Sequence, residues 1–195
     1  KPSELPHPVA GFETLTFGVL GMGRIGSATL HRARPFGFRL MACDPYLPDS
    51  AFPTDVVRAD FESLLRSVDI LSLHAPSTAE TQHILNTRTL SLMKPTAIVV
   101  NTARGSLIDT AALINAINTG KLSCAGLDVF EREPLPDNDE VRQCDRLIIT
   151  PHYAWHSRES RPRLYCMAVE EAIRAATGQP LRSCINGIQS DHSLT

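Results

Sequence analysis

The sequence has no C-x-x-C pair, and its five cysteines are an odd number spread over 195 residues. This scarcity argues against a disulfide framework and against a zinc site built from thiolates. It favours a reducing compartment, and we therefore expect a cytoplasmic protein. The cysteines are Cys43, Cys124, Cys144, Cys166 and Cys184.

Long apolar runs and an excess of basic charge are also missing. No run approaches the roughly 20 apolar residues that a membrane-spanning helix needs, and the first residues lack the apolar centre of a signal peptide. The formal net charge is −2, which gives no electrostatic reason to expect nucleic acid or anionic membrane as a partner. One local basic cluster, Arg158, Arg161 and Arg163, is interpreted as the solvated start of a helix.

Short apolar segments alternate with amphipathic ones through most of the chain. Nearly continuous apolar segments are typical of strands that are covered on both faces, and alternation with helices is typical of a parallel sheet. We expect strands at 15–20, 38–44, 69–74, 97–101, 124–129 and 146–150, and helices at 24–35, 60–67, 87–93, 109–119 and 157–177. The predicted fold is α/β, a Rossmann-type doubly wound parallel sheet in a single domain.

Proline and glycine positions suggest where the domain and its helices end. Residues 1–13 are punctuated by proline and are predicted to be a linker, residues 14–156 the dinucleotide-binding domain, and residues 157–195 a final helix and tail. Pro35 should end or kink the first helix, with Gly37 completing the turn. Gly178 is the expected stop of the last helix.

A glycine motif follows the first predicted strand and opens the first predicted helix. Gly21, Gly23 and Gly26 form G-x-G-x-x-G in the strand–turn–helix context that the motif requires. Gly21 would allow the tight turn, Gly23 the close approach of a pyrophosphate, and Gly26 the close packing of helix and strand. The free N–H groups of the helix start would bind the phosphates.

Asp44 ends the second predicted strand, at about the distance of ~20 residues expected for the acid that binds the adenosine ribose. A carboxylate there accepts hydrogen bonds from the ribose hydroxyls and repels a 2′-phosphate, so we predict NAD(H) rather than NADP(H). The alternative is an aspartate that only starts a turn before Pro45.

Three later segments place polar residues where strands end, on the edge at which open α/β sheets bind ligands. Arg104 precedes Gly105, which we expect to turn the chain with a positive φ, and it would bind a substrate carboxylate. His152 would exchange a proton with the substrate, and Glu133 would orient the imidazole. Asp128 would lie near the nicotinamide. This set suits hydride transfer between a nicotinamide and a 2-hydroxy or 2-oxo acid.

The stretches GMGRIG, DPY, HAPST, NTARGSLID, GLDVFEREP and TPH together resemble the D-isomer-specific 2-hydroxyacid dehydrogenase family, over residues 14 to about 156. The resemblance implies a catalytic set of Arg104, Glu133 and His152. It implies a cofactor site lined by Gly21, Gly23, Arg24, Ile25, Gly26, Asp44, His74, Thr102, Ala103, Arg104 and Asp128. Ser77 departs from the leucine that is commoner in the family at that position, which puts a minor packing contact in doubt.

The segment TPHYAWHS resembles the C-terminal-binding-protein branch of the family, although Tyr153 and His156 depart from its usual residues. Trp155 is then a candidate for the substrate pocket, and an anchor for the final helix is the alternative. The family implies a homodimer. It also implies a substrate domain built from roughly the first hundred residues, which we expect to be largely absent here, so that the chain alone would turn over poorly.

Two other functions compete with the dehydrogenase. An NAD(H)-sensing corepressor would carry the same three residues, and NADH-dependent assembly would distinguish it from an enzyme. A metal site made by His152 and His156, four positions apart on a helix, is less favoured. The glutamate of H-E-x-x-H is missing, and Pro151 with the preceding strand makes a helix at His152 doubtful.

Overall fold

The computed structural model describes residues 10–182, and the chain divides into two compact units, one ending at His152 and the other beginning at Tyr153. The predicted linker 1–13 and the predicted tail to residue 195 thus lie largely outside the described residues. Phe12, at the end of that linker, packs its ring 4.9 Å from the ring of Phe38. In the described part, no helix combines the length and the apolarity needed to cross a membrane.

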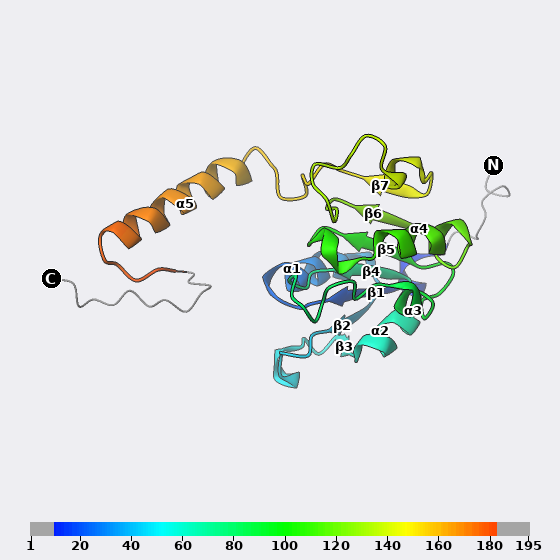
Figure 1. The fold of residues 1–195 in the computed structure, drawn as a ribbon. Coiled ribbons are helices and arrows are strands. Elements are labelled where there is room, and N and C mark those ends of the chain that lie inside the picture. Colours follow the sequence, from blue (N-terminus) through cyan, green and yellow to red (C-terminus); the bar gives the residue numbers. More distant parts are fainter. Residues whose placement is uncertain (1–9, 183–195) are drawn as a thin grey trace. The chain divides into compact units, whose positions relative to one another are not determined.

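The first unit contains a seven-stranded parallel sheet in the order β3-β2-β1-β4-β5-β6-β7 (Figure 1). The strands are β1 Thr16–Leu20, β2 Arg39–Cys43, β3 Val56–Arg58, β4 Ile70–Leu73, β5 Ile98–Asn101, β6 Cys124–Leu127 and β7 Leu147–Ile149. The strand order reverses beside β1, whose neighbours are β2 and β4. This is the doubly wound Rossmann-like arrangement, and the predicted fold class is confirmed.

The helices of this unit are α1 Arg24–Ala33, α2 Phe61–Ser67, α3 Thr87–Leu90 and α4 Thr110–Asn118. Pro35 acts as predicted, because α1 ends at Ala33 and a 3-10 turn follows, closed by Gly37 at φ 86°. The structure differs from the predicted elements at two places. It contains the strand β3, which was not predicted, since its three residues lie at the sheet edge and Val57 is 60% exposed. The helix expected at 87–93 is only four residues long.

The core lies mainly between the sheet and the helices α2, α3 and α4, where Leu64, Leu71, Leu113 and other residues are fully buried. A smaller cluster, which includes Val19 and Leu30, lies under α1 on the other face. The strand register puts Val19 on the same face as Ile148 of β7, yet Ile148 is 75% exposed. Within the first unit, the α1 face is therefore well covered at β1 and open at β7.

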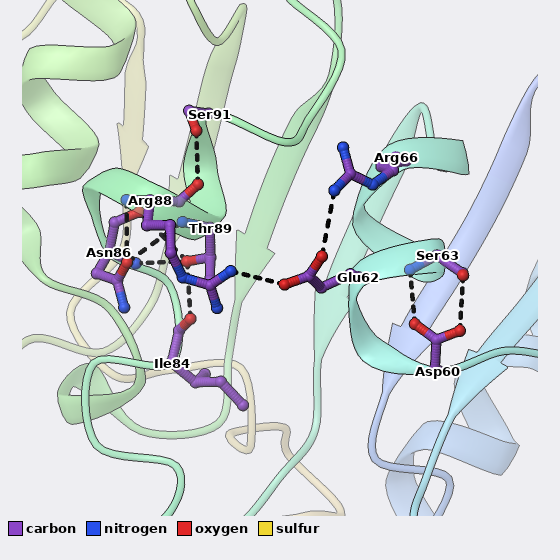
Figure 2. Close-up of polar contacts among 9 residues, drawn as sticks. All are labelled: Asp60, Glu62, Ser63, Arg66, Ile84, Asn86, Arg88, Thr89 and Ser91. Carbon is purple, nitrogen blue, oxygen red and sulfur yellow. Dashed lines mark hydrogen bonds and ion pairs between the residues drawn. The ribbon is translucent and has the colours of Figure 1, made fainter.

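Local capping explains how so short a helix as α3 forms. Asn86 accepts hydrogen bonds from the N–H groups of Arg88 and Thr89, and the Thr89 hydroxyl accepts one from the Asn86 N–H, which is a capping box (Figure 2). Asp60 caps α2 in a similar way. Glu62 of α2 then accepts a 2.6 Å hydrogen bond from Arg88, so the two helix starts are joined. These contacts fix the start of α3, which a four-residue helix cannot stabilise by its own length.

The second unit consists of a turn and the helix α5, Ser160–Ala176. The helix starts three residues later than predicted because Ser160 donates a hydrogen bond to the Trp155 carbonyl and closes the turn before it. Gly178 follows the helix at φ 68°, as expected of a stop residue. His152 lies outside this helix, so the arrangement of His152 and His156 on one helical face does not form.

The buried centre of the sheet should dominate stability. Leu71→Ala in β4 should lower the free energy of unfolding by about 2–5 kcal/mol, because the cavity left at a fully buried site is not refilled. Ile148→Ala in β7, a matched removal of methyl groups at an exposed site, should cost less than about 1 kcal/mol. Urea denaturation measures both values, and equal losses would contradict this account of the core.

Candidate active site

The glycine loop lies at the carboxyl end of β1, between the ends of β2 and β4. Gly21 has φ 89°, a left-handed conformation that side chains disfavour. A Cβ on Gly26 would lie 2.0 Å from the Gly21 carbonyl oxygen, whereas a Cβ on Gly23 would have nothing within 4 Å. The three glycines therefore differ in role: Gly21 turns the chain, Gly26 allows a close contact within the protein, and Gly23 leaves open space in front of the helix start.

Asp44 directly follows β2 and holds this loop in place. One carboxylate oxygen accepts a 2.9 Å hydrogen bond from the Met22 N–H, and the other accepts one of 3.1 Å from the Tyr46 N–H. Asp44 also lines a cavity of about 540 Å³ together with Gly21, Tyr46 and Glu80. Each oxygen keeps a lone pair for a ligand in that cavity. Asp44 thus supports the glycine loop and is also available to bind a ligand. The sequence indicated only the ligand-binding role.

His74 follows β4 and packs directly behind the glycine loop. A Cβ on Gly21 would lie 2.8 Å from the His74 carbonyl carbon, and the His74 ring lies 3.0 Å from the Ser72 hydroxyl. Burial lowers the pKa of His74, so its imidazole is neutral near pH 7. Arg24 and Ile25 open α1 at the same place, and Ile25 is 68% exposed although it is apolar. A cofactor contact would explain that exposure.

Arg104 follows β5 in a turn that Asn101 organises. The buried Asn101 side chain accepts a hydrogen bond from the Ala103 N–H and donates one to the Arg104 carbonyl. Thr102 is exposed between them. The Arg104 guanidinium is exposed and donates a 2.6 Å hydrogen bond to the Ala103 carbonyl, so its charge is not engaged with Glu133 or His152 in this conformation.

Gly105 was expected to have a positive φ, and this expectation was wrong. Gly105 is not among the glycines with positive φ. Instead, a Cβ there would lie 1.9 Å from the carbonyl carbon of Phe130, and 2.4 Å from the nitrogen of Glu131. Glycine is needed because the turn after Arg104 lies directly against the backbone of the loop that carries Glu133. This contact brings the Arg104 and Glu133 segments together.

Glu133 and His152 meet as the sequence predicted. The Nδ1 atom of His152 lies 2.7 Å from a carboxylate oxygen of Glu133, and the other oxygen accepts a hydrogen bond from the Phe130 N–H. Partial burial raises the pKa of Glu133, but these hydrogen bonds outweigh it, and the net pKa is below the ordinary value. The ionised Glu133 therefore holds a proton on Nδ1, which leaves Nε2 as the ring atom for a substrate.

The backbone at His152 is strained. His152 has φ 58°, which is uncommon for a residue other than glycine, and its N–H donates to the carbonyls of Asp128 and Thr150. Asp128 is buried just after β6, and its carboxylate accepts a 2.5 Å hydrogen bond from the Thr150 hydroxyl. Such conformations persist where the surroundings fix them and are frequent at functional sites. His152 and Glu133 also line a cavity of about 720 Å³ with Phe130, Leu135 and Arg142.

A second histidine–glutamate pair holds the same loop, and the sequence did not indicate it. His83 Nε2 lies 2.7 Å from a carboxylate oxygen of Glu131, whose other oxygen accepts a hydrogen bond from the N–H of Thr110 at the start of α4. The His83 N–H donates to the Ser106 carbonyl, two residues beyond Arg104. Partners 48 positions apart in sequence leave no local pattern that would reveal them.

The candidate site residues thus fall into two groups. One is the glycine loop with Asp44 and His74, and the other is the set of turns that carry Arg104, Asp128, Glu133 and His152. Trp155 belongs to the second unit, where its ring packs edge-on to that of His156 at 5.2 Å, and its role in a substrate pocket stays a prediction. Among residues 10–182, no group of three or more His, Cys, Asp or Glu side chains could hold a metal ion.

The chain is similar to known proteins. The family described as "D-isomer specific 2-hydroxyacid dehydrogenase, NAD binding domain" matches residues 5–154. A glyoxylate reductase from Korarchaeum cryptofilum is 40% identical over 184 residues, which are 93% of this chain and 55% of the reductase. A D-3-phosphoglycerate dehydrogenase from Bacillus subtilis is 40% identical over 172 residues, 88% of this chain and 33% of that protein.

Solved structures agree with these relatives. A D-lactate dehydrogenase from Aquifex aeolicus, complexed with NAD and lactic acid, has a TM-score of 0.79 at 33% identity, and the match covers 87% of this chain and 56% of that one. The chain therefore spans about half the length of the reductases and dehydrogenase structures it matches.

The sheet order, the glycine loop at the strand-order reversal and the polar edge define a dinucleotide-binding domain of the Rossmann type. The chain belongs to the D-isomer specific 2-hydroxyacid dehydrogenase family, and most of it is the NAD binding domain of that family.

The Glu133–His152 pair should make the acid stability of the protein depend on Glu133. A carboxyl group whose pKa is lowered in the folded state stabilises the fold above its ordinary pKa of about 4.3, and this contribution is lost as the pH falls through the lower, folded value. The urea midpoint of the wild type should therefore fall more steeply between about pH 5 and pH 3 than that of Glu133→Gln. Parallel curves for the two proteins would show that the pair does not form.

Proposed function

We propose that this chain is the cofactor-binding part of an NAD(H)-dependent oxidoreductase that transfers hydride between the cofactor and a 2-hydroxy or 2-oxo acid. The observation that carries the proposal is the 2.7 Å contact of His152 Nδ1 with Glu133, on the same edge of the sheet as the glycine loop. The relatives named as glyoxylate reductase, D-3-phosphoglycerate dehydrogenase and D-lactate dehydrogenase support it.

The residues at the glycine loop fit the cofactor. The open space at Gly23 leaves room for a pyrophosphate, and Gly23 caps α1 without a side-chain hydrogen bond, so the first N–H groups of the helix are available to phosphate oxygens. Asp44 would bind the adenosine ribose. When bound, NADH supplies the hydride. Arg24, Ile25, His74, Thr102, Ala103 and Asp128 are the remaining residues that we expect to contact it.

The catalytic roles follow from charge and hydrogen bonding. Arg104, whose guanidinium is exposed, would turn from the Ala103 carbonyl to a substrate carboxylate and hold it by two hydrogen bonds. Protonated His152 would give the Nε2 proton to the substrate carbonyl oxygen during reduction and take it back during oxidation. Glu133 would keep the imidazole oriented. It would also stabilise the positive charge that the imidazole carries before it gives up a proton in reduction and after it takes one in oxidation.

The finer assignments stay predictions. The C-terminal-binding-protein-like branch depends on the turn from Tyr153 to Ser157, where the Tyr153 and His156 rings stack at 5.3 Å. The NAD(H)-sensing corepressor is not favoured, because the relatives at hand are named as reductases and dehydrogenases. The homodimer, the cytoplasmic location, and the absence of nucleic acid and membrane partners also stay predictions.

The proposal is tested by single-turnover oxidation of bound NADH with glyoxylate, which detects even slow chemistry. In the wild type the rate should rise with glyoxylate concentration. His152→Ala should bind NADH as well as the wild type does and react slower by about a hundredfold or more, since a general acid contributes at least that factor. Equal rates for the two proteins would refute the role of His152, and failure of the wild type to bind NADH would refute the function.

The open space at Gly23 gives a separate prediction. Gly23→Ala should leave the urea midpoint nearly unchanged, because its Cβ meets no protein atom within 4 Å. It should weaken NADH binding by about tenfold or more, because the methyl group occupies space that the pyrophosphate needs.

The control is Gly126→Ala in β6. A Cβ at Gly126 also has nothing within 4 Å, and this position is not part of the glycine loop. This variant should fold and bind NADH like the wild type. Undiminished NADH binding by Gly23→Ala, measured by fluorescence titration, would contradict the position assigned to the cofactor.

A further inference from the structure

The cavity beside Asp44 contains a second carboxylate, that of Glu80. Its lining includes these two acidic side chains, and no lysine, arginine or histidine is among the lining residues that the structure describes. The rest of the wall is mostly apolar. It is formed by Leu20, Gly21, Cys43, Pro45, Tyr46, Phe61, Ala75, Pro76, Thr78, Ala79, Thr81 and Ile84. A ligand in this cavity therefore meets negative charge from two separate segments of the chain.

Tyr46 connects the two acidic groups. Its hydroxyl donates a 2.5 Å hydrogen bond to a carboxylate oxygen of Glu80, and its N–H donates to Asp44. The hydrogen bond to Glu80 raises the pKa of Tyr46, which is the direction expected when a phenol donates to a carboxylate. Tyr46 is 78% exposed, and the strong hydrogen bond is what keeps this side chain against Glu80.

The turn that carries Glu80 is itself well fixed. The Thr81 hydroxyl donates to the Pro76 carbonyl at 2.6 Å and accepts a hydrogen bond from the Thr78 N–H at 2.8 Å. The Gln82 N–H also donates to the Thr78 carbonyl. The turn around Glu80 is thus held by hydrogen bonds of its neighbours, and the Glu80 side chain by that of Tyr46.

The two carboxylates differ in what they already bind. Both oxygens of Asp44 accept backbone hydrogen bonds, from Met22 and from Tyr46. Replacing Asp44 would therefore disturb the glycine loop as well as remove a charge. Glu80 accepts from the side chain of Tyr46, and a change there leaves the loop contacts intact. Glu80 is for this reason the cleaner position at which to examine the charge of the cavity.

We propose that Glu80 is a second determinant of cofactor choice, which together with Asp44 excludes dinucleotides carrying a 2′-phosphate, and that Tyr46 is its positioning residue. The inference rests on the proposed function, because it takes this cavity as the place of the cofactor's adenosine. The exposed Glu80 and the partly buried Asp44 both line this cavity with negative charge and would repel the phosphate dianion, and none of the lining residues that the structure describes is a cation.

The experiment is a fluorescence titration of NADH and NADPH on the wild type, Glu80→Gln and Tyr46→Phe. The wild type should bind NADH and bind NADPH much more weakly. Glu80→Gln should bind NADPH about tenfold more tightly, while its NADH affinity stays within about twofold, since it keeps the side-chain shape and removes only the charge. Tyr46→Phe should shift the ratio of the two affinities in the same direction by a smaller factor.

The matched control is Glu140→Gln, an exposed glutamate in the 3-10 turn Glu140–Gln143 that does not line this cavity. It should keep the wild-type ratio. The ratio of NADH affinity to NADPH affinity should also fall as salt is added, because salt screens charge repulsion. In Glu80→Gln this ratio should fall less than in the wild type, because one of the two repelling charges is gone. A merely structural role of Tyr46 or Glu80 would not change the salt dependence.

Two results would overturn the inference, and they are distinguishable. If the wild type binds NADH and Glu80→Gln keeps its affinity ratio, Glu80 does not contribute to cofactor choice although the proposed function stands. If the wild type does not bind NADH, the proposed function fails and the inference fails with it.

Discussion

The site depends on the close approach of backbone segments at the carboxyl edge of the sheet, which only glycine allows. Gly26 lets the start of α1 contact the Gly21 carbonyl, and Gly105 lets the turn after Arg104 contact the Phe130 carbonyl. A Cβ at either position would lie about 2 Å from another backbone atom, a distance that the packed interior cannot relieve without moving a whole segment. The polar side chains that follow β2, β4, β5, β6 and β7 share one edge because the strands are parallel, and these two contacts bring loops of that edge together.

Two histidine–glutamate hydrogen bonds then hold the loop between Phe130 and Pro134. Glu131 is paired with His83, and Glu133, two residues on, is paired with His152. The first pair also bonds the start of α4 and lies beside the Arg104 turn, so it belongs to the scaffold. The second borders a cavity and leaves one imidazole nitrogen for chemistry. The His83–Glu131 pair thus stabilises the loop, and the His152–Glu133 pair carries the proposed proton transfer.

Much of this could be predicted from the sequence, because the decisive signals are local. Apolar segments predicted six of the seven strands, and the sequence singled out the glycine loop and Asp44, which the structure places in contact. The short edge strand β3 was missed, since three residues, of which only Val56 is buried, are too few to show a periodicity. The pairs His83–Glu131 and Tyr46–Glu80 were missed because their partners lie 48 and 34 positions apart and meet only in the folded chain. The close contact at Gly105 was hidden in the same way, so the glycine beside Arg104 was assigned a positive φ that it does not have.

The central claim is that one edge of this sheet binds NAD(H), with the phosphates at the glycine loop, the adenosine beside Asp44 and the nicotinamide toward Arg104 and His152. Amide chemical shifts recorded during an NADH titration test it directly. The account predicts the largest changes at Met22–Gly26, at Asp44 and Tyr46, and at Thr102–Arg104, with little change in α3 and α4. Changes confined to α3 and α4, or no change on addition of a large molar excess of NADH, would contradict it.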